Sequence, residues 1–428
     1  MICFRVRLTG IILVFSSVVT LAQYQATQKD SLLQSISDQD YTKGVLIADS
    51  LIRLNPDNPD LYYLSGLCYR NLMKFGPAAD HFRLSDSLAP GNKRVLANLA
   101  DSYYELARLD EAEKTARLMV SLDSLDPVGW IQLGKIYVRM SRPFTAIEIY
   151  NRLSLSDSLN LWYPRQIANL LLREERLQDA MGYLLFLAEA DSSDIENYLR
   201  IGQTAMRMGA RGLVPVMDKA VRQDSTEALL YRYRGGLQLA EGEFASAEED
   251  LLKAISLGDT SVYAYRYLGM SQYSQSAYGR ALQSLEKTVA KDSADAQSWY
   301  YLGFCYKWNL NIPKAIECLN KALKTAIPEF AGSVYSGLGQ MYSLRRDTKQ
   351  AMICYEKALE YNPSDPAPMA QIGLLIEESM GDREKAKEYY ENFLKAYRGT
   401  DRNLVSYLKS RIQTINEKLF MEGKLKKE

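Results

Sequence analysis

The sequence predicts an all-α solenoid of stacked antiparallel helix pairs, and three observations predict it. A small residue recurs every 34 residues between Gly66 and Gly202. Apolar residues surround each of these positions at spacings of three, four and seven, which place them on one face of a helix. The 428-residue chain has 13 prolines and is rich in Leu, Ala, Glu, Lys and Arg, which favour helix. A stack of small units also lets a chain of this length avoid one oversized core.

The recurring small residue marks ten copies of one unit. The step between copies is 34 residues, except for 33 before Gly235 and 36 before Gly339. Around it lie a bulky residue four positions before, often Tyr three after, and Ala twelve after. The ten small residues are Gly66, Ala100, Gly134, Ala168, Gly202, Gly235, Gly269, Gly303, Gly339 and Gly373.

Each copy is predicted to fold as a helical hairpin. In the eighth copy Trp299, Gly303 and Tyr306 share one face of a first helix, and Ala315 opens the apolar stripe of a second. The polar segment 307–313 between them is short, so the two helices must be antiparallel neighbours. Gly303 and Ala315 are small because the two backbones approach there. Neither helix can bury its apolar face alone, so neighbouring hairpins must stack.

This pattern resembles the tetratricopeptide repeat, whose frame is Trp-x2-Leu-Gly-x2-Tyr followed by Ala, an aromatic residue, Ala and Pro. The match covers roughly residues 25 to 395. It implies a right-handed superhelix of helix pairs. Only some copies end in Pro, and others end in Asp-Ser, as at Asp123-Ser124 and Asp292-Ser293. We expect these Asp-Ser pairs to cap the next hairpin.

The fifth copy departs most from the frame. Gly209, Gly212 and Pro215 stand where its turn and second helix should be, and Ala220 comes one residue early. Two interpretations remain open. One is a shortened second helix, and the other is a local break in curvature near residues 205–216 that divides the array into two arms.

The N-terminal residues are typical of an export signal. Arg5 and Arg7 precede an apolar run that ends near Thr20-Leu21-Ala22, the kind of small-residue site that a signal peptidase cleaves. We interpret residues 1–22 as a cleaved signal. The alternative is an uncleaved anchor, but the apolar run is shorter than the roughly 20 residues that span a bilayer.

The remaining chain divides into four predicted regions. A degenerate first repeat covers residues 23–58, and the repeat array covers 59–204 as a first arm and 205–400 as a second. Residues 401–428 are a capping helix with a charged tail. Its apolar stripe is Leu404, Leu408, Ile412, Ile415 and Leu419.

Composition and motifs argue against catalysis, cofactors and nucleic acid. The 52 basic residues balance 52 acidic ones, so no overall field attracts nucleic acid. The single histidine, His81, cannot complete a His-based metal site, and phosphate-binding, dinucleotide-binding and nucleophile motifs are absent. We expect the carboxylate pairs Glu248-Glu249 and Glu377-Glu378 to lie on solvated helix faces. We expect no cofactor, no metal and no catalytic residue.

The resemblance implies a concave groove lined by the first helices of successive repeats. Arg165 and Asn169 resemble half of the clamp by which some family members hold a terminal carboxylate, but Glu196 and Leu229 stand where the following clamp residues belong. The alternative is that the groove arginines pair with neighbouring acids or stay solvated. The implied groove residues are Tyr63, Arg70, Tyr104, Arg139, Arg165, Asn169, Arg173, Met206, Arg207, Arg232, Arg266, Tyr273, Tyr300, Phe304, Lys307 and Trp308.

A groove of arginine and aromatic residues suits a protein or peptide that is acidic or rich in aromatic residues. The expected function is a non-enzymatic interaction scaffold of the cell envelope, exported to the periplasm or secreted, without a membrane span once the signal is removed. The alternative is a structural subunit of a secretion or surface-polymer assembly that uses the convex face and the array ends. A disulfide between Cys305 and Cys318 stays open.

Overall fold

The computed structural model describes residues 27–422, and the predicted signal and the charged tail beyond Glu422 lie outside them. The chain divides into two compact units, unit 1 up to Ala190 and unit 2 from Asp191 onward. In both, the described residues form helices and turns without a β-strand. The predicted arm boundary between residues 204 and 205 concerns the curvature of the array, and it stays a prediction.

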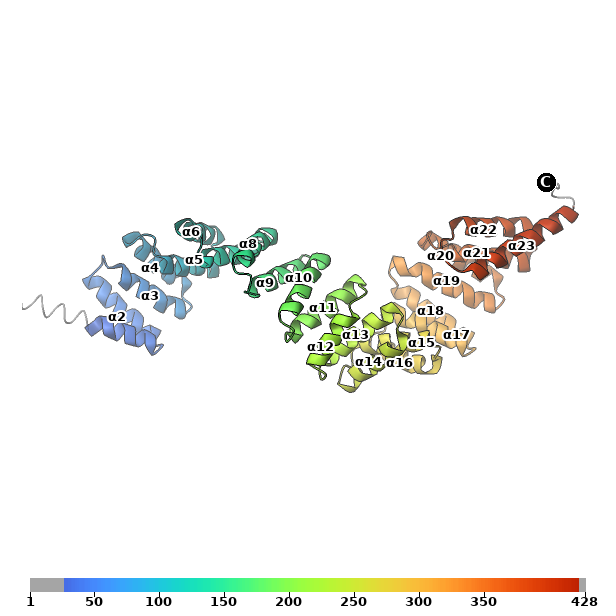
Figure 1. Ribbon diagram of the computed structural model, residues 1–428, viewed down its shortest axis with the longest axis horizontal. Coiled ribbons are helices and arrows are strands. Elements are labelled where there is room, and N and C mark those ends of the chain that lie inside the picture. Colours follow the sequence, from blue (N-terminus) through green and yellow to red (C-terminus); the bar gives the residue numbers. More distant parts are fainter. Residues whose placement is uncertain (1–26, 423–428) are drawn as a thin grey trace, which may run out of the picture. The chain divides into compact units, whose positions relative to one another are not determined.

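Unit 1 is a series of antiparallel helix pairs (Figure 1). It begins with a helix at residues 27–37, which pairs with α2 as predicted for the degenerate first repeat. The first helices of the pairs that follow are α3, α5, α7 and α9, and the second helices are α4, α6, α8 and α10. Their bounds are α2 Tyr41–Leu54, α3 Pro59–Asn71, α4 Phe75–Leu88, α5 Lys93–Glu105, α6 Leu109–Leu122, α7 Pro127–Arg139, α8 Pro143–Ser156, α9 Trp162–Arg173 and α10 Leu177–Ala190.

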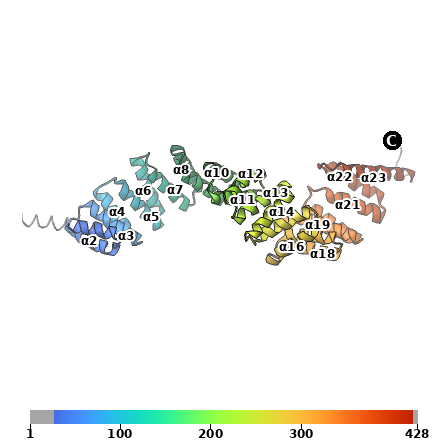
Figure 2. The ribbon, with the colours of Figure 1, turned by 60° about the horizontal axis from the view of Figure 1, so that its bottom comes forward.

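Unit 2 continues the same alternation, with odd-numbered first helices and even-numbered second helices up to α22 (Figures 1 and 2). A short π-helix, η1, extends α21. The bounds are α11 Ile195–Met208, α12 Val214–Gln223, α13 Ala228–Glu241, α14 Phe244–Ser256, α15 Val262–Ser274, α16 Tyr278–Lys291, α17 Ala296–Trp308, α18 Ile312–Thr325, α19 Pro328–Leu344, α20 Thr348–Tyr361, α21 Ala367–Leu375, η1 Ile376–Met380, α22 Arg383–Ala396 and α23 Arg402–Met421.

Helix lengths explain both irregular steps of the repeat. The second helix of the fifth copy, α12, has 10 residues where α10 has 14, which confirms the predicted shortening. Gly209 and Gly212 in the turn before it have φ values of 61° and 79°, which glycine adopts without strain. In α19 the first helix grows to 17 residues, and this extra turn accommodates the longer step before Gly339.

The frame glycines lie where paired helices touch, as predicted, except Gly202, whose added Cβ would meet Tyr233 of the next repeat. A Cβ added to Gly303 would lie 3.2 Å from the backbone oxygen of Ala315 and 2.8 Å from Cγ of Leu319. In unit 1 a Cβ on Gly134 would lie 2.6 Å from the ring of Tyr150. Any larger residue would push the two helices apart.

The C-terminal helix α23 caps unit 2 as predicted. Leu408, Ile415 and Leu419 are buried against the last repeat, and Leu404 and Ile412 pack beside them. Figures 1 and 2 show α23 beside α22, its principal helix contact.

Two expectations about acidic residues are wrong. Asp123 is not the N-cap of the next helix; its carboxylate accepts a hydrogen bond from the Leu125 N–H at 3.0 Å, and Asp126 caps α7 instead. Asp-Ser therefore shapes the turn before the cap. Glu248 is buried rather than solvated and accepts hydrogen bonds from Gln272 at 3.0 Å and Gln275 at 2.9 Å.

The second carboxylate pair is also partly internal. Glu377, in η1, forms an ion pair with Arg411 of α23 at 2.5 Å and accepts a hydrogen bond from the Tyr390 hydroxyl at 2.9 Å. This hydrogen bond and burial raise the pKa of Tyr390, with burial the larger cause. Glu249 and Glu378, the other members of the two pairs, are exposed as expected.

Candidate functional site

The packing of the helices separates an inner face from an outer face in each unit. First helices contact the first helix of the next repeat, as α5 contacts α7 and α13 contacts α15. Second helices make their principal contacts with first helices. We call the surface formed by the first helices the inner face and that formed by the second helices the outer face.

The inner face of unit 2 holds a pocket of about 370 Å³ between α11, α13 and α15. Three tyrosine rings, one thioether, two guanidinium groups and one amide line it, and none of the lining residues carries a carboxylate. The lining residues are Gln203, Met206, Arg207, Arg232, Tyr233, Tyr263 and Tyr267. Such a hollow suits an apolar side chain better than a flat surface does.

Arginine and tyrosine side chains alternate along this pocket. The guanidinium carbon of Arg232 lies 4.9 Å from the ring centre of Tyr233 and 5.9 Å from that of Tyr263. Arg266 lies 5.0 Å from the Tyr263 ring centre and 5.3 Å from that of Tyr267. These cation–π contacts hold the rings in place.

The two arginines are themselves neutralised by the following repeat. Arg232 donates to the carboxylate of Asp259 at 3.1 Å and to the Ser261 hydroxyl at 3.1 Å. Arg266 donates to Asp295 at 3.3 Å. The Arg232 and Asp259 side chains are only 14% and 5% exposed, so this pair is internal.

An aromatic cluster continues the inner face over α15, α17 and α19. Tyr300 lies 4.9 Å from Phe304 and 5.3 Å from Phe330 between ring centres. Trp308 stacks on Tyr278 of α16 at 5.1 Å with an interplanar angle of 7°, and half of its surface stays exposed. Burial raises the pKa of Tyr300 to about 12, so its hydroxyl stays neutral at physiological pH.

Lys307 lies above this cluster. Its ammonium group is 5.8 Å from the Phe304 ring and 5.2 Å from the Trp308 ring, and it donates to the amide oxygen of Gln340 at 3.1 Å. Burial lowers the pKa of Lys307 from its ordinary value of 10.5. This part of the inner face is therefore aromatic, with the Lys307 ammonium group beside it.

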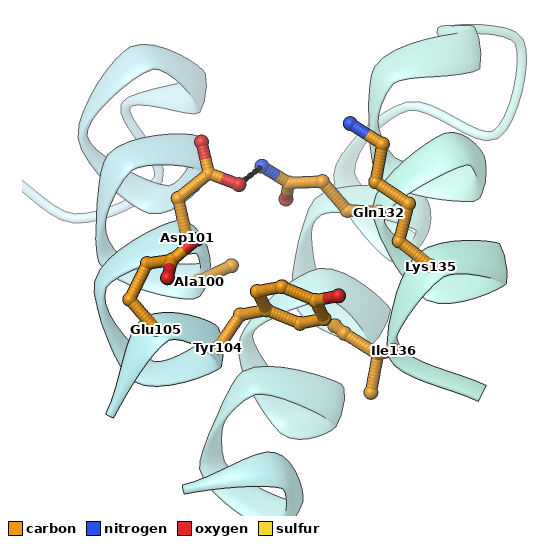
Figure 3. Close-up of a pocket in the computed structure, with 7 residues that line it drawn as sticks. All are labelled: Ala100, Asp101, Tyr104, Glu105, Gln132, Lys135 and Ile136. Atoms are coloured by element: carbon orange, nitrogen blue, oxygen red, sulfur yellow. Dashed lines mark hydrogen bonds between the residues drawn. The ribbon is translucent and has the colours of Figure 1, made fainter. Parts of the chain in front are cut away.

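The corresponding pocket of unit 1 is small and polar (Figure 3). It measures about 90 Å³ and lies between α5 and α7, where Gln132 donates to Asp101 at 3.2 Å. Burial raises the pKa of Asp101, against the opposing charges of Lys135 and Arg70 and the hydrogen bond from Gln132. Figure 3 shows Asp101 and Glu105 on one side and Lys135 on the other.

Comparison with known proteins identifies the repeat. Two tetratricopeptide-repeat family models match residues 332–365 and 371–400. A solved structure of IFIT1 bound to m7Gppp-AAAA has the same fold at 16% identity and a TM-score of 0.50; the match covers 86% of this chain and 84% of that one. This chain is a tetratricopeptide-repeat protein.

Two curated relatives share part of this repeat array. Human protein O-mannosyl-transferase TMTC3 is 28% identical over 138 residues, which are 28% of this chain and 15% of that protein. Mouse protein O-mannosyl-transferase TMTC3 is 23% identical over 245 residues, 52% of this chain and 26% of that protein. The chain thus spans about a quarter or less of their length. Tetratricopeptide-repeat arrays generally serve as scaffolds that bind proteins or peptides on extended surfaces.

Unit 1 brings together only some of the predicted groove residues. Arg139 lies 4.5 Å from the Tyr104 ring and donates to the Tyr104 backbone oxygen. Arg70 donates to Asn98 of the next first helix. Tyr63 packs against Phe82 of the second helix, so it belongs to the hairpin interior. Arg165, Asn169 and Arg173 all lie on α9, where the first two are half-buried and Arg173 is exposed.

Unit 2 gathers its predicted groove residues into the two inner-face sites described above. Arg207 and Met206 line the pocket with Arg232, while Tyr273, Tyr300, Phe304, Lys307 and Trp308 form the aromatic cluster. Two interpretations of Arg232 and Arg266 were open, contact with an acidic ligand or pairing with neighbouring acids. They follow the alternative interpretation, because Asp259 and Asp295 pair with them.

Sequence reasoning missed Tyr233, Tyr263 and Tyr267, which supply the pocket walls. Tyr233 and Tyr267 occupy the position two before the frame glycine in successive copies, a position that points along the stack toward the previous repeat: Tyr233 meets Gly202. The repetition of Tyr at this register in the sixth, seventh and eighth copies was the available signal.

The described cysteines, Cys68, Cys305, Cys318 and Cys354, are free and buried. Burial raises the pKa of Cys305 to about 12 and that of Cys318 to about 11, so both stay protonated thiols. Both belong to one apolar cluster between α17 and its neighbours. Within residues 27–422, no helix combines the length and the apolar character needed to cross a membrane.

Proposed function

We propose that this protein is a non-enzymatic interaction scaffold that holds a protein or peptide segment on the inner face of unit 2. The observation that carries the proposal is the exposure of aromatic side chains there. Tyr263 is 53% exposed and Trp308 is 52% exposed, and each sits above a structured aromatic site. Exposed aromatic residues on a rigid helical surface supply contact area at small entropic cost, as binding hot spots do.

The absence of catalysis is part of this proposal. The buried Glu248 is held by Gln272 and Gln275, and the partly buried Glu377 by Arg411, so these carboxylates serve the packing of the helices rather than a reaction. The two relatives are named transferases, but the matched segment is a quarter or less of each. A shared fold does not imply a shared activity, so the transferase names of these relatives do not assign catalysis to the matched segment.

The proposed location is the cell envelope or the exterior, because residues 1–22 read as an export signal. Because aspartates neutralise Arg232 and Arg266, the range of chemistry expected of the partner is narrower. It offers apolar or aromatic side chains first, and acidic groups only as a supplement near Arg207 and Lys307.

A second candidate is a structural subunit that is assembled through its outer face. One observation favours it: exposed leucines recur at the same register on α4 and α6, namely Leu84, Leu88, Leu118 and Leu122. They stand on successive second helices, one repeat apart. Such an apolar surface is typical of contacts within an assembly.

Site-specific photo-crosslinking separates the two candidates. A photoreactive amino acid replaces Tyr263 or Trp308 on the inner face, and Leu84 or Leu118 on the outer face, in cells that express the protein. The scaffold proposal expects adducts with a common partner from Tyr263 and Trp308 only. Adducts confined to Leu84 and Leu118 would establish the structural subunit instead, and the absence of adducts at all four positions would contradict both.

A further inference from the structure

The small pocket of unit 1 contains a buried hydrogen-bond acceptor without a donor. Gln132 of α7 is 8% exposed, and its amide nitrogen donates to the backbone oxygen of Ala97 at 3.0 Å and to the Asp101 carboxylate at 3.2 Å. Because a backbone oxygen can only accept, it fixes the amide nitrogen on its own side. Among the described residues, no group donates a hydrogen bond to the amide oxygen of Gln132. A buried polar atom in this state costs stability until a donor reaches it.

This amide belongs to the wall of the pocket. Gln132 and Tyr104 both line it. Figure 3 shows the Gln132 side chain reaching from α7 toward Asp101, with the amide oxygen turned to the side of the Tyr104 ring. The pocket measures about 90 Å³, so it admits a compact polar group rather than a bulky side chain.

Asp101 is a second acceptor in the pocket, and it has no ionic partner. Burial raises the pKa of Asp101, so its charged form is poorly stabilised in the folded chain. Lys135 and Arg70 act on it only as nearby charges. Arg70 donates instead to Asn98, and no ion pair joins Asp101 to Lys135. A cation placed beside this carboxylate would offset the cost of its burial.

Glu105 adds a third acceptor and decides the charge of the pocket. It follows Asp101 by four residues on α5, so the two carboxylates share one face of that helix. Figure 3 shows both of them on one side of the pocket and Lys135 on the other. Two carboxylates and one ammonium group therefore line the pocket, and this excess of negative charge favours a cation.

The number of acceptors and the size of the pocket select the kind of cation. An ammonium group is a compact charge with three N–H donors, one for each of the three acceptors. A guanidinium group spreads five donors over a planar fork and needs more room than about 90 Å³ between two helices provides. Lysine is the side chain that carries an ammonium group on a slender apolar stem.

We propose that the pocket between α5 and α7 binds the ammonium group of a lysine side chain in a protein partner. The ammonium group donates to the carboxylates of Asp101 and Glu105 and to the amide oxygen of Gln132. This inference rests on the proposed scaffold function, because the inner face of a repeat array holds extended segments of other proteins. It adds a contact on unit 1 whose chemistry differs from that of the aromatic sites of unit 2.

The test uses a displayed library of random linear peptides as the probe, selected on the full-length protein. We expect lysine to be enriched at one position of the selected peptides. Replacing that lysine by norleucine, which keeps the stem and removes the ammonium group, should weaken binding on the order of 10-fold. Arginine at the same position should restore only part of the binding, because its fork does not fit three converging acceptors.

Two variants assign the contact to the pocket. Asp101→Asn removes one negative charge and still accepts the hydrogen bond from Gln132. It should weaken the lysine peptide on the order of 10-fold and leave the norleucine peptide unchanged. Glu105→Gln removes a charge from an exposed side chain and should weaken binding about 2- to 5-fold.

Glu148→Gln is the matched control. Glu148 is exposed on the second helix α8, so this variant removes the same charge from unit 1 but not from the pocket. It should bind the lysine peptide as wild type does. The urea midpoint of Asp101→Asn should equal or exceed that of wild type, which separates lost binding from lost folding.

Three results would overturn the ammonium site and leave the scaffold proposal standing. They are selection of peptides without lysine, equal binding of the lysine peptide to wild type and Asp101→Asn, and equal weakening by Asp101→Asn and Glu148→Gln. The last of these would indicate a general attraction between charges rather than a site. Enrichment of no peptide on wild type would contradict both the ammonium site and the peptide binding that the scaffold proposal requires.

Discussion

Units 1 and 2 share one repeat frame, but the middle repeats of unit 1 and the first repeats of unit 2 fill their helix contacts with different chemistry. In unit 1 a single apolar cluster runs from Ala78 to Ala180. In unit 2 the cluster around Leu251 and Leu268 is small, and buried ion pairs fill its surroundings. Arg234 there binds Asp250 through two hydrogen bonds of 2.6 and 2.7 Å. The residues of the repeat frame determine where helices touch. The residues at the other positions determine whether apolar side chains or ion pairs fill the contact.

Arg234 also shows what the ionic contacts of unit 2 achieve. Besides Asp250 of α14 it binds Asp218 of α12 at 2.8 Å, so it ties the shortest of the second helices to the next hairpin. An apolar contact tolerates sliding, whereas a bidentate ion pair sets one register. The weakest copy of the frame is thus tied to the next hairpin by a directional contact.

The largest expected effect compares two aspartates at corresponding turns. Asp259 pairs with Arg232 in unit 2, and Asp123 pairs with Lys93 in unit 1, where the side chains are 37% and 44% exposed. Asp259→Asn leaves Arg232 buried without its counter-charge and should cost about 3 kcal/mol. Asp123→Asn should cost less than about 1 kcal/mol, since Lys93 keeps Asp126 at 3.4 Å.

Hydrogen exchange measures this difference locally, which suits an array whose repeats need not unfold together. Protection should fall in α13 and α15 for Asp259→Asn and change little in α5 and α7 for Asp123→Asn. Asparagine keeps the oxygen that accepts the turn N–H of Ser261 or Leu125, so the turn itself is controlled. Equal losses of protection in both units would show that burial of the ion pair does not affect its contribution to stability.

The next effect tests the close helix contact at the frame glycine, which both units share. Gly134→Ala in unit 1 and Gly269→Ala in unit 2 would place a Cβ 2.6 Å from the Tyr150 ring and 2.5 Å from Cγ of Leu285. Overpacking should cost each unit about 1–2 kcal/mol after the gain in helix propensity is subtracted. Urea unfolding followed by hydrogen exchange of the affected hairpin checks it. A loss in only one unit would mean that the close contact is not common to the frame.

The sequence was sufficient to predict the repeat frame, because the spacing of its small and apolar residues follows directly from the contacts between helices. The closeness of Gly303 to Ala315 and the apolar stripe of α23 both follow from it. The partners of charged residues follow no such regular spacing, so the sequence does not identify them. Arg232 and Arg266 face the inner side as their register predicts, but their acids lie 27 and 29 residues later in the next turn.

Substitutions within the frame were the overlooked signal. The tyrosine expected three after the frame glycine is Gln272 in the seventh copy, and this replacement gives Glu248 a buried partner at 3.0 Å. Gly236 is likewise visible in the sequence as the one glycine at its register, and its small size makes room for the Met206 side chain. Deviations from a repeat therefore locate its particular packing contacts better than the consensus does.

A smaller effect concerns glycines that no packing explains. Gly182 in α10 and Gly279 in α16 have nothing within 4 Å of an added Cβ. Gly182→Ala should stabilise unit 1 by about 0.5–1 kcal/mol, because it lies inside its helix. Gly279→Ala should gain less, since Gly279 is the second residue of α16. Thermal or urea unfolding checks both, and a loss of stability at Gly182 would reveal a contact in the exposed surface of α10.

The smallest effect is a pH dependence confined to the unit 1 pocket. Burial raises the pKa of Asp101 in the folded chain above its ordinary value of 3.8, so folding disfavours its charged form. At neutral pH this carboxylate therefore costs stability, and Asp101→Asn, which still accepts the hydrogen bond from Gln132, should be slightly more stable than wild type. The advantage should shrink as pH falls through the raised pKa, and should vanish below the ordinary value, where wild type is protonated in both states. Urea midpoints of both proteins at neutral and acidic pH measure it. An advantage that grew on acidification would mean that Lys135 and Arg70 stabilise the charged form more than burial opposes it.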